Sequence, residues 1–358
     1  MKSKTSIGIL MNALDMGGAE KQSLIQAKLM GTEFNVHYIV QKKKPQLKQH
    51  IDFIKKENIN YIQLSGNIIS RFFQLNRYIK QNEIKVLFAY LSLDNLLASL
   101  LSLFRKIKYV GGVRSSYLPF VKFNVTLVLQ KYFLDYVIFN NHFGRELFIK
   151  KGFSPSKSIV IQNCINTTRE EIVRGERDKI RILSVGRFTP EKDYLTALKT
   201  IDILNKKKFA KEIEYIIVGD GELFHQVQSW VENLNLLNVT IVRNPDKVGD
   251  YYIGADIYFL SSDSEGMPNS IMEAFNYSLP VVSTEVGDAA YLVKDGQNGY
   301  LASIKDCEKL ADRLSELISD SNKRIDFGKN GHRLLINEFS GEKYTNEYIA
   351  FTNSILSQ

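Results

Sequence analysis

The chain has 358 residues, of which 44% are hydrophobic and 24% are charged, and this composition excludes a disordered or fibrous protein. At roughly 150 residues per domain, the length predicts two or three domains. The two cysteines, Cys164 and Cys307, are too few for a disulfide framework or a cysteine metal cluster, which favours a reducing compartment. The first residues form too short an apolar run for a secretory signal, so a cytoplasmic protein is expected.

Positive charge is concentrated in the first half of the chain. Residues 1–168 contain 24 lysines and arginines against 9 carboxylates, a net charge of +15, whereas residues 169–358 carry a net charge of −7. This asymmetry predicts that the first half faces a polyanionic surface, such as a membrane or a nucleic acid. The alternative is an ordinary solvated surface that is rich in lysine.

The first half alternates short apolar runs with polar segments that suit helices, which is typical of a doubly wound α/β domain. Strands are expected over residues 6–11, 35–41, 58–64 and 84–90. After the first of them, Gly17 and Gly18 would let the backbone approach a phosphate or a sugar at the start of a helix. Two adjacent glycines are also compatible with a bare turn, and the Gly-x-Gly-x-x-Gly pattern of dinucleotide-binding proteins does not occur here.

Residues 86–104 form the one apolar run that is long enough to span a bilayer. Asp94 and Asn95 lie at its middle, and an aspartate at a bilayer centre costs about 2.5–3.5 kcal/mol on insertion scales. The run also divides naturally into a buried strand that ends near Tyr90 and a core helix that begins at about Asn95. It is therefore expected to belong to the core of a domain and not to a membrane.

A polar segment at residues 166–179 has no apolar periodicity and is expected to link two domains. The second half then restarts as a fresh doubly wound domain, with strands expected in the segments IRILSVG, EYIIVG, VTIVRN, IYFLSS and PVVST. Residues 340–358 are expected to form a final helix.

The stretch from Ser261 to Val286 has the pattern of a strand, a loop, a helix and a strand. Pro268 and Asn269 suit the start of its helix. Glu265 lies in the loop and Glu273, eight positions later, lies about one turn into the helix. A helix N-terminus offers unpaired N–H groups to an anion, and Glu273 would accept hydrogen bonds from hydroxyls of the same ligand. Glutamates in first turns are also common as simple partners of the helix dipole.

Arg187 and Lys192 follow the strand that opens the second half, at the carboxyl end where α/β domains bind ligands. Arginine can bind a phosphate through two hydrogen bonds, and lysine adds a compact charge. The pair therefore suits a phosphate group of a ligand, and the alternative is a solvated turn.

Four motifs occur in an informative order: GGAE at 17–20, GRFTPEKDY at 186–194, VGDGE at 218–222, and two glutamates separated by seven residues at 265–273. With these motifs, nearly the whole chain resembles the retaining glycosyltransferases of family four. The resemblance implies an α/β protein of the GT-B fold, with two doubly wound Rossmann-like domains facing a central cleft. The parts would be an acceptor-binding domain at 1–168, a nucleotide-sugar-binding domain at 169–339, and a helix at 340–358 that crosses back to the first domain.

The resemblance also implies roles for single residues. Arg187 and Lys192 would hold the donor diphosphate as catalytic groups, together with Glu265, which would contact the hydroxyls of the donor sugar. Glu273 would bind the ribose. The other expected donor contacts lie in turns and in the loop before the helix, at Gly18, Val242, Arg243, Asn244, Gly266, Met267, Pro268, Asn269 and Ser270. Met267 and Pro268 stand where the family often has Phe and Gly, so the sugar pocket is expected to differ in shape.

On the acceptor side, Arg114 stands where many family members have a histidine aimed at the reaction centre. This departure puts a catalytic histidine in doubt, although an arginine there would still contact the acceptor or a phosphate. Ser115 and His142 complete the expected acceptor contacts. His142 stands where the family often has a serine, and it is also compatible with a purely structural role.

Neither an Asp-x-Asp metal signature nor a His/Cys cluster with ligand spacing occurs in the sequence. The expectation is therefore a metal-independent enzyme without a cofactor, in which Arg187 and Lys192 supply the positive charge. Members of the family retain the anomeric configuration, and in the favoured front-face account the departing phosphate helps to remove the acceptor's proton. No protein base is assigned for this reason.

The expected activity is transfer of a hexose from a nucleoside diphosphate sugar, with UDP as the expected carrier, to a lipid-linked glycan in the biosynthesis of a surface polysaccharide such as lipopolysaccharide or capsule. The enzyme would work at the inner face of the cytoplasmic membrane, bound peripherally to anionic lipid, and without a nucleic-acid partner. One alternative is a catalytically inactive GT-B partner subunit that binds sugar or glycoprotein. Another is a nicotinamide-dependent oxidoreductase, which the missing dinucleotide motif disfavours.

Overall fold

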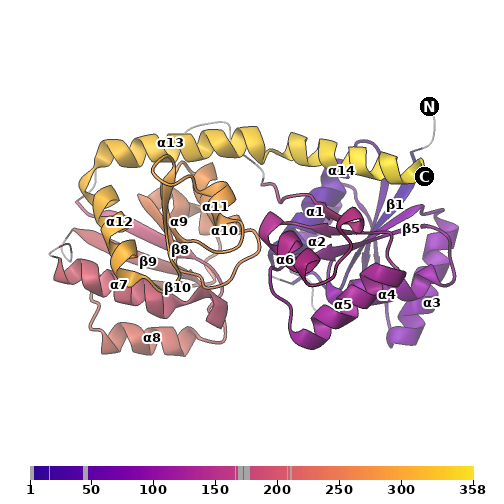
Figure 1. The fold of residues 1–358 in the computed structure, drawn as a ribbon, viewed down its shortest axis with the longest axis horizontal. Coiled ribbons are helices and arrows are strands. Elements are labelled where there is room, and N and C mark those ends of the chain that lie inside the picture. The colour runs from indigo at the N-terminus through magenta and orange to yellow at the C-terminus, as the bar shows by residue number, and fades with distance from the viewer. Residues whose placement is uncertain are drawn as a thin grey trace. The chain divides into compact units, whose positions relative to one another are not determined.

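The structure is a computed structural model that describes residues 4–15, 17–42, 47–165, 167, 172, 178–207, 209 and 212–358. The chain folds as two compact units, one formed by Met1–Cys164 with Gly341–Gln358 and the other by Ile165–Ser340 (Figure 1). The boundary expected at residue 168, and most of the linker expected at residues 166–179, lie outside the described residues.

The first unit is built on a sheet whose seven described strands run parallel, in the order β3-β2-β1-β4-β5-β6-β7. The strands are β1 (Ser6–Met11), β2 (Asn35–Val40), β3 (Asn60–Gln63), β4 (Val86–Ala89), β5 (Lys108–Val113), β6 (Tyr136–Phe139) and β7 (Ser158–Val160). The helices are α1 (Gly18–Met30), α2 (Lys48–Lys56), α3 (Ile68–Gln81), α4 (Ser92–Ser102), α5 (Phe120–Tyr132), α6 (His142–Lys150) and α14 (Gly341–Leu356), with a 3-10 turn η1 (Pro155–Lys157). The four strands expected from the sequence between residues 6 and 90 are all confirmed.

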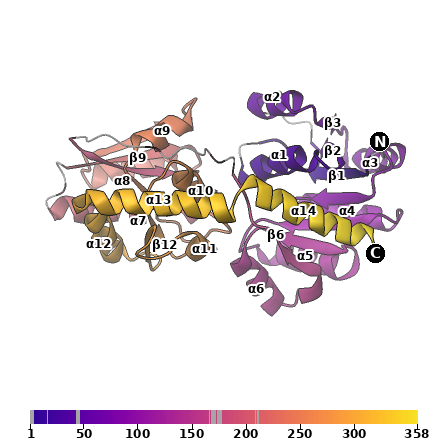
Figure 2. The same cartoon turned by 90° about the horizontal axis from the view of Figure 1, so that it is seen from above.

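Both faces of the first sheet are covered, because successive side chains of a strand point to opposite faces. Ile7 and Ile9 of β1 pack in a cluster with α1 and α14, whereas Leu10 packs in a second cluster with α3, α4, α5 and α6. Seen from above, α1 and α14 lie side by side over this sheet (Figure 2). The helix expected at residues 340–358 is thus present as α14, and it completes the core of the first unit.

The apolar run at residues 86–104 divides as expected. It contributes the buried strand β4 and the helix α4, with Asp94 in the first turn of that helix. Within the described part of the chain, every helix is too short or too polar to cross a bilayer.

The second unit repeats the same architecture around a sheet of six described parallel strands, in the order β10-β9-β8-β11-β12-β13. The strands are β8 (Ile180–Val185), β9 (Ile213–Gly219), β10 (Val239–Arg243), β11 (Ile257–Leu260), β12 (Val281–Thr284) and β13 (Gly299–Ala302). The helices are α7 (Tyr194–Lys206), α8 (Phe224–Asn233), α9 (Val248–Gly254), α10 (Asn269–Asn276), α11 (Ala289–Leu292), α12 (Cys307–Ser319) and α13 (Ser321–Glu338), with a 3-10 turn η2 (Pro190–Lys192). The five strands expected in this half are confirmed.

The strand order of each sheet reverses once, and these reversals place the ligand sites. In the first sheet the chain winds outward in both directions from β1 and β4, and in the second from β8 and β11. In open α/β sheets, ligands bind outside the carboxyl ends of the strands at such a switch point. A ligand site of the second unit is therefore expected at the loops that follow β8 and β11.

Candidate functional site

The loops after β8 and β11 are fastened to each other. The backbone N–H of Asp263 donates to the carbonyl oxygen of Glu191 at 3.0 Å. The hydroxyl of Ser261 donates to the carbonyl oxygens of Lys192 and Asp193, both at 3.0 Å. Two segments about 70 residues apart in sequence therefore form one rigid edge at the switch point of the second sheet.

Lys192 and Glu265 meet at the centre of this edge. Lys192 Nζ donates to Glu265 Oε1 at 2.5 Å, and the side chains are only 16% and 14% exposed. The hydroxyl of Ser262 donates to the same carboxylate oxygen at 2.9 Å. An ion pair that is partly removed from water interacts more strongly than one on the surface, because the local dielectric is lower. The structure thus brings together two of the residues that the resemblance assigned to the donor.

Arg187 lies in the same loop but is far more exposed to solvent than Lys192. Its side chain is 68% exposed, and its Nη2 donates to Oε1 of Glu191, four residues later in the loop, at 3.4 Å. A surface pair of this geometry contributes little to stability. The guanidinium is therefore available to a ligand at low cost, whereas Lys192 must be shared with Glu265.

The two glycines of VGDGE are required by a close backbone approach. A Cβ atom at Gly219 would overlap the carbonyl oxygen of Gly186, and one at Gly221 would lie 2.5 Å from the carbonyl oxygen of Phe188. The backbone N–H of Phe188 also donates to the carbonyl oxygen of Asp220 at 2.9 Å. The motif after β9 thus supports the loop that carries Arg187.

Gly287 supports the loop of Glu265 in the same way. Its φ of +51° lies in the left-handed region that favours glycine, and a Cβ there would overlap the carbonyl oxygens of Glu265 and Gly266. The backbone N–H of Asp288 donates to the Gly266 carbonyl at 2.9 Å. The chain after β12 is therefore packed directly under the loop of Glu265.

The helix α10 begins at Asn269, with Pro268 in the N-cap position, as expected. The side chain of Met267 is only 5% exposed and packs in the apolar core of the second unit. Only the backbone of Met267 is therefore presented to a ligand.

Glu273 lies about one turn into α10 and is held by a tyrosine from α9. Tyr252 donates its hydroxyl to Glu273 Oε2 at 3.0 Å. Burial is the largest cause that raises the pKa of Tyr252 well above its ordinary value, so the hydroxyl keeps its proton. The ring of Tyr252 stacks on that of Tyr277, with centroids 5.2 Å apart and an interplanar angle of 4°. This arrangement fixes the carboxylate of Glu273 in one direction.

The third group of expected donor contacts, at the end of β10, is tied to the VGDGE loop. Arg243 donates to Asp220 Oδ1 through Nε at 3.0 Å and Nη2 at 2.8 Å, and Asn244 donates to Asp220 Oδ2 at 2.5 Å. Donation from Arg243 is the largest cause that lowers the pKa of Asp220. The Arg243 guanidinium also lies 4.1 Å from the ring centroid of Phe224. Val242 packs beside these groups against the core.

In the first unit, the carboxylate of Glu20 lies at the N-terminus of α1. Gly17 is the N-cap of α1 in an extended conformation, and a Cβ there would overlap the carboxylate of Glu20. A negative side chain at a helix N-terminus is favourable and competes with an anionic ligand. The helix start at Gly18 is therefore better suited to hydroxyl groups than to a phosphate.

Arg114 follows β5 at the carboxyl edge of the first sheet. Its Nη2 donates to the hydroxyl of Tyr348 on α14 at 3.2 Å, and its guanidinium carbon lies 4.2 Å from the ring centroid of Tyr90. Its Nε and Nη1 are buried and have no hydrogen-bond partner among the described residues. The side chain therefore stabilises α14 and keeps two donors for another group.

Ser115 and His142, the other two expected acceptor contacts, lie just after β5 and β6. The hydroxyl of Ser115 donates to the carbonyl oxygen of Tyr117 at 2.7 Å. His142 is the first residue of α6, after the N-cap Asn141. Burial is the largest cause that raises the pKa of Glu347 on α14, and the charge of His142 opposes that shift. His142 therefore lies close enough to α14 to interact with it.

Three residues at these edges are given no site role by the sequence, although it places Asp94 in the core of a domain. Ser262 and Tyr252 hold the two glutamates, and Asp94 is fully buried beside Gln41, whose Nε2 donates to Asp94 Oδ1 at 2.5 Å. Burial is the largest cause that raises the pKa of Asp94 to about 8. A carboxylate in the middle of an apolar run was the available signal for Asp94. Tyr252 and Ser262 carry no signal of this kind, because their partners are defined only by the fold.

No group of three or more His, Cys, Asp or Glu side chains is arranged to hold a metal ion within the described ranges. Charge at the edge of the second sheet is instead carried by the side chains of Arg187, Lys192, Glu265 and Glu273.

Residues 166–334 match the family described as glycosyl transferases group 1. The match covers the loops after β8 and β11, the helix α10 and most of the second unit. This part of the chain therefore belongs to the glycosyl transferases group 1 family, and the retaining glycosyltransferases of family four are consistent with that membership.

Curated relatives are similar over about half of the chain. An uncharacterized glycosyltransferase of Methanocaldococcus jannaschii is 30% identical over 193 residues, which are 52% of this chain and 51% of the relative. The UDP-Gal:alpha-D-GlcNAc-diphosphoundecaprenol alpha-1,3-galactosyltransferase of Escherichia coli is 24% identical over 210 residues, 55% of this chain and 54% of the relative. The chain thus spans about half the length of the curated relatives that it matches.

Solved structures extend the likeness of fold to the whole chain. Anabaena Alr3699/HepE in complex with UDP-glucose has a TM-score of 0.85 and 17% sequence identity, over 98% of this chain and 99% of that one. At this identity the likeness establishes the fold alone. The GT-B fold with two Rossmann-like domains, predicted from the four motifs, is confirmed.

Proposed function

We propose that this protein is a retaining, metal-independent hexosyltransferase that uses a nucleoside diphosphate sugar, with UDP as the carrier, and a lipid-linked glycan acceptor. The observation that carries this proposal is the contact of Lys192 with Glu265 at the switch point of the second sheet. One cation for the diphosphate and one carboxylate for the sugar hydroxyls are what donor binding requires there.

The donor would be held along the edge of the second sheet. Arg187 and Lys192 would bind the diphosphate, and Glu265, fixed by Lys192 and Ser262, would accept hydrogen bonds from the donor sugar. Glu273, fixed by Tyr252, would accept hydrogen bonds from the ribose. The backbone from Gly266 to Ser270 and the segment from Val242 to Asn244 would flank the sugar and the base. The family match and the UDP-glucose complex of the similar Anabaena structure support a nucleotide sugar as the ligand.

In the transfer, the bond between the anomeric carbon and the diphosphate oxygen breaks, and the acceptor hydroxyl forms its bond on the same face of the sugar. The acceptor's proton passes to the departing diphosphate, so a protein base is not required. Negative charge grows on the diphosphate as it leaves, and Arg187 and Lys192 stabilise it. Preorganised charges of this kind contribute most when they are partly excluded from water, as Lys192 is.

The acceptor would bind at the carboxyl edge of the first sheet. Buried polar atoms without a hydrogen-bond partner among the described residues lie at this edge, on Asn12, Gln41 and Arg114. Such atoms favour a ligand rich in hydroxyl groups, because each unpaired buried group costs about 1–3 kcal/mol. The name of the Escherichia coli relative, which acts on a diphosphoundecaprenol-linked sugar, supports a lipid-linked acceptor. The excess of basic residues in the first half supports work at the inner face of an anionic membrane, in the cytoplasm.

A catalytically inactive partner subunit remains the second candidate. It would be expected to lack the diphosphate-binding side chains, and Arg187 and Lys192 are both present with the geometry described above. We therefore favour the enzyme.

A panel of UDP-linked sugars separates the two functions. Donors are first ranked by the thermal shift that they produce, and UDP release is then measured with each in the presence of a membrane extract. The enzyme is expected to release UDP with at least one donor, whereas thermal shifts without any turnover across the panel would favour the partner subunit.

Chelation tests metal independence separately. Turnover is expected to stay largely unchanged in EDTA, because the side chains of Arg187 and Lys192 carry the cation role. A loss of turnover that Mg²⁺ or Mn²⁺ restores, and that slow product release does not explain, would refute this part of the proposal.

A further inference from the structure

The outer faces of α4 and α5 are apolar and exposed. Along α5 the exposed side chains follow one another at helical spacing, and they are Val121, Val125, Val128 and Tyr132. Along α4 and just after it they are Leu96, Leu100, Leu103 and Phe104. The two helices pack against each other in the first unit (Figure 1). The two rows therefore form one surface, which we call the α4–α5 apolar face.

The helix α5 is fixed in an orientation that exposes its valines. Thr126 and Gln130 are each only 1% exposed, whereas Val125 and Val128 are 43% and 48% exposed. The buried polar groups are satisfied by backbone: Thr126 donates to the carbonyl of Lys122 at 2.7 Å, and Gln130 exchanges two hydrogen bonds of 3.2 Å with Ser154. Rolling the helix to bury the valines would expose Thr126 and would break the two bonds between Gln130 and Ser154, which lies outside α5. The fold therefore holds α5 in an orientation that leaves its row of valines exposed.

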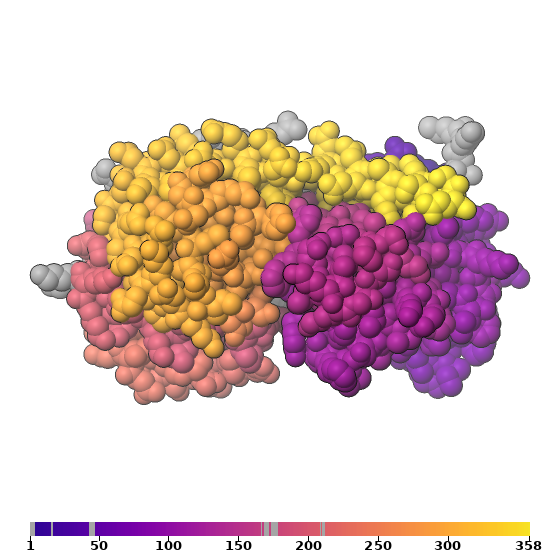
Figure 3. Space-filling view, in the orientation of Figure 1, coloured from indigo at the N-terminus to yellow at the C-terminus, as the bar shows by residue number. Residues whose placement is uncertain are grey.

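A contiguous apolar surface in water marks an interaction site more often than a single exposed residue does. Phe120 and Val121, at the start of α5, are 81% and 72% exposed. In the second unit, by contrast, the exposed apolar residues lie apart on different elements, for example Leu237 after α8 and Ile325 on α13. In Figure 3 the purple and magenta atoms of the α4–α5 segment lie at the surface of the first unit.

The charges around this face are mostly basic. Residues 95–134 contain no aspartate or glutamate, and besides Arg114, which is turned to Tyr90 and Tyr348, they contain five basic side chains: Arg105, Lys106, Lys108, Lys122 and Lys131. Lys122 and Lys131 are exposed on α5 itself, beside the valines. An apolar row bordered by lysines matches the two layers of an anionic bilayer, because the acyl region accepts the apolar side chains and the lipid phosphates attract the lysines.

A basic pocket of about 530 Å³ opens at one end of the face. Arg105 and Lys106 line it from the turn that follows Leu103 and Phe104, and Tyr132 lines it from the end of α5. Lys85 and Lys108 complete its positive lining, and Asp135, the acidic residue in it, accepts a hydrogen bond from the backbone of Tyr109 at 2.8 Å.

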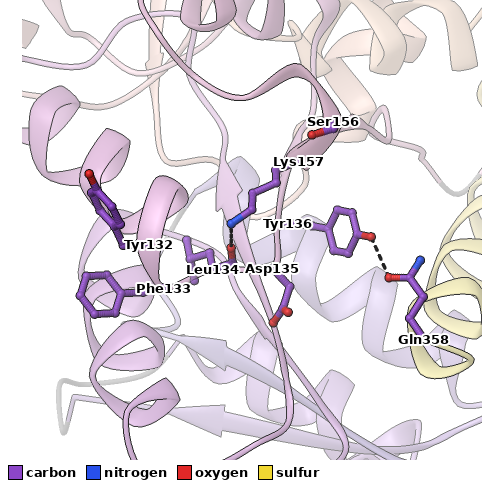
Figure 4. Close-up of a pocket in the computed structure, with 8 residues that line it drawn as sticks. All are labelled: Tyr132, Phe133, Leu134, Asp135, Tyr136, Ser156, Lys157 and Gln358. Carbon is purple, nitrogen blue, oxygen red and sulfur yellow. Dashed lines mark hydrogen bonds between the residues drawn. The ribbon is translucent and has the colours of Figure 1, made fainter.

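A neighbouring cavity of about 340 Å³ is less suited to an anion (Figure 4). Its lysine, Lys157, donates to the backbone carbonyl of Leu134 at 3.0 Å, and Tyr136 donates to Gln358 at 3.1 Å (Figure 4). Lys157 and Tyr136 of this smaller cavity are thus committed to the fold. In the larger pocket Arg105 donates through Nε to Asn76, but Lys85, Lys106 and Lys108 add positive charge there, so the larger pocket is better suited to a phosphate group.

From these observations we propose that the α4–α5 apolar face inserts into the interfacial layer of an anionic phospholipid bilayer, with a lipid phosphate in the larger pocket. This rests on the proposed function in one respect, since it places the first unit where a lipid-linked acceptor resides. It differs from attraction by charge alone in a measurable way. Salt screens the lysines within about 10 Å at 0.1 M, whereas it leaves the apolar contribution in place.

The test is sedimentation of the full chain with vesicles of phosphatidylglycerol and phosphatidylcholine, and with vesicles of phosphatidylcholine alone, at low and at high salt. The wild type should bind the anionic vesicles strongly at low salt and keep a measurable part of that binding at high salt. A triple variant, Val121→Gln with Val125→Gln and Val128→Gln, retains helix propensity and should bind about tenfold more weakly at both salt concentrations.

Two further variants separate the contributions. Lys122→Gln with Lys131→Gln should weaken binding about tenfold at low salt and leave the salt-resistant part unchanged. The matched control, Leu237→Gln with Tyr291→Gln and Ile325→Gln, removes three exposed apolar side chains from the second unit and should bind as the wild type does.

Three outcomes would overturn the proposal. The triple valine variant could bind vesicles as tightly as the wild type, or the wild type could bind neither kind of vesicle. Gel filtration could also show a wild-type dimer that the triple variant converts to a monomer, and the face would then belong to a second copy of the chain. Calorimetric titration of the same samples with UDP keeps the proposed function separate, because a failure of vesicle binding with normal UDP binding affects the membrane proposal alone.

Discussion

The carboxyl edges of the two sheets are built differently. In the second unit the loops of the switch point are bonded to each other, and Lys192 and Glu265 neutralise each other within them. In the first unit, buried polar atoms of Gln41 and Arg114 lack a partner among the described residues. One edge is therefore held in place by its own bonds, as the proposed donor site requires, whereas the other offers unpaired polar atoms to a ligand.

The largest effect is expected from the two cations of the second unit. Lys192→Ala should lower turnover about 10³-fold and Arg187→Ala about 10²-fold, because Lys192 acts in the less solvated position. Steady-state kinetics with circular dichroism measures both activity and folding. Lys207→Ala, which removes an ion pair with Asp312 at 2.7 Å on the surface of the same unit, is the matched control and should be near normal. A well-folded double variant of Arg187 and Lys192 with near-normal turnover would show that the edge has another role.

The next effect concerns the support of the Glu265 loop. Gly287→Ala should destabilise the second unit by about 3 kcal/mol and weaken UDP binding, because the new methyl group overlaps two carbonyl oxygens at a φ of +51°. Gly296→Ala is the control, since Gly296 also has a positive φ, +72°, but its Cβ position has no atom within 4 Å. Its cost should be about 1 kcal/mol. Equal losses in thermal unfolding of the two variants would mean that the packing under the loop is unimportant.

In the first unit, stability should depend on pH through Asp94. Its pKa is about 8 in the folded chain, above the ordinary value of 3.8, so the folded state keeps a proton that the unfolded state loses. The stability contributed by this group is therefore present below about pH 4 and is lost as the pH rises to about 8, at about 1.4 kcal/mol per unit.

Asp94→Asn should remove that dependence. The variant is expected to gain about 2 kcal/mol over the wild type between pH 6 and pH 8, and the free Oε1 of Gln41 can accept a hydrogen bond from the new amide. Denaturant unfolding at several pH values measures the slope. Asp52→Asn, on the exposed side of α2, should leave it unchanged. A variant of Asp94 with the wild-type slope would place the titrating group elsewhere.

The smallest effect is expected at Tyr252, which holds Glu273 without contacting the reacting atoms. Tyr252→Phe should raise the KM for the donor several-fold with little change in kcat, because the ring stays and only the hydroxyl is lost. Tyr251→Phe, at the neighbouring position of α9, is the control. An unchanged KM in the Tyr252 variant would mean that Glu273 needs no orienting partner.

Local patterns in the sequence predicted the elements that carry the donor loops. Pro268 before Asn269 predicted the start of α10, and the aspartate within residues 86–104 predicted a strand and a helix in place of a membrane span. The ion pair of Lys192 with Glu265 joins positions 73 residues apart, so only the motif resemblance placed the two residues in one site.

Other features depended on the direction of a side chain. Met267 reads as a pocket residue from its place in the loop, but its side chain is in the core. The valines of α5 are exposed because Thr126 and Gln130 occupy the buried side of that helix, where Gln130 is bonded to the backbone of Ser154. Charge alone predicted an electrostatic membrane contact. With the exposed valines, we expect a membrane contact that partly resists salt.

The central claim is that the edge of the second sheet binds the nucleoside diphosphate of a donor sugar. Calorimetric titration of the wild-type chain with UDP, and separately with NADH, tests it most directly. We expect saturable binding of one UDP per chain, weakened in Lys192→Ala, and no heat from NADH. Binding of NADH without binding of UDP, or UDP binding that is unchanged in Lys192→Ala, would contradict it.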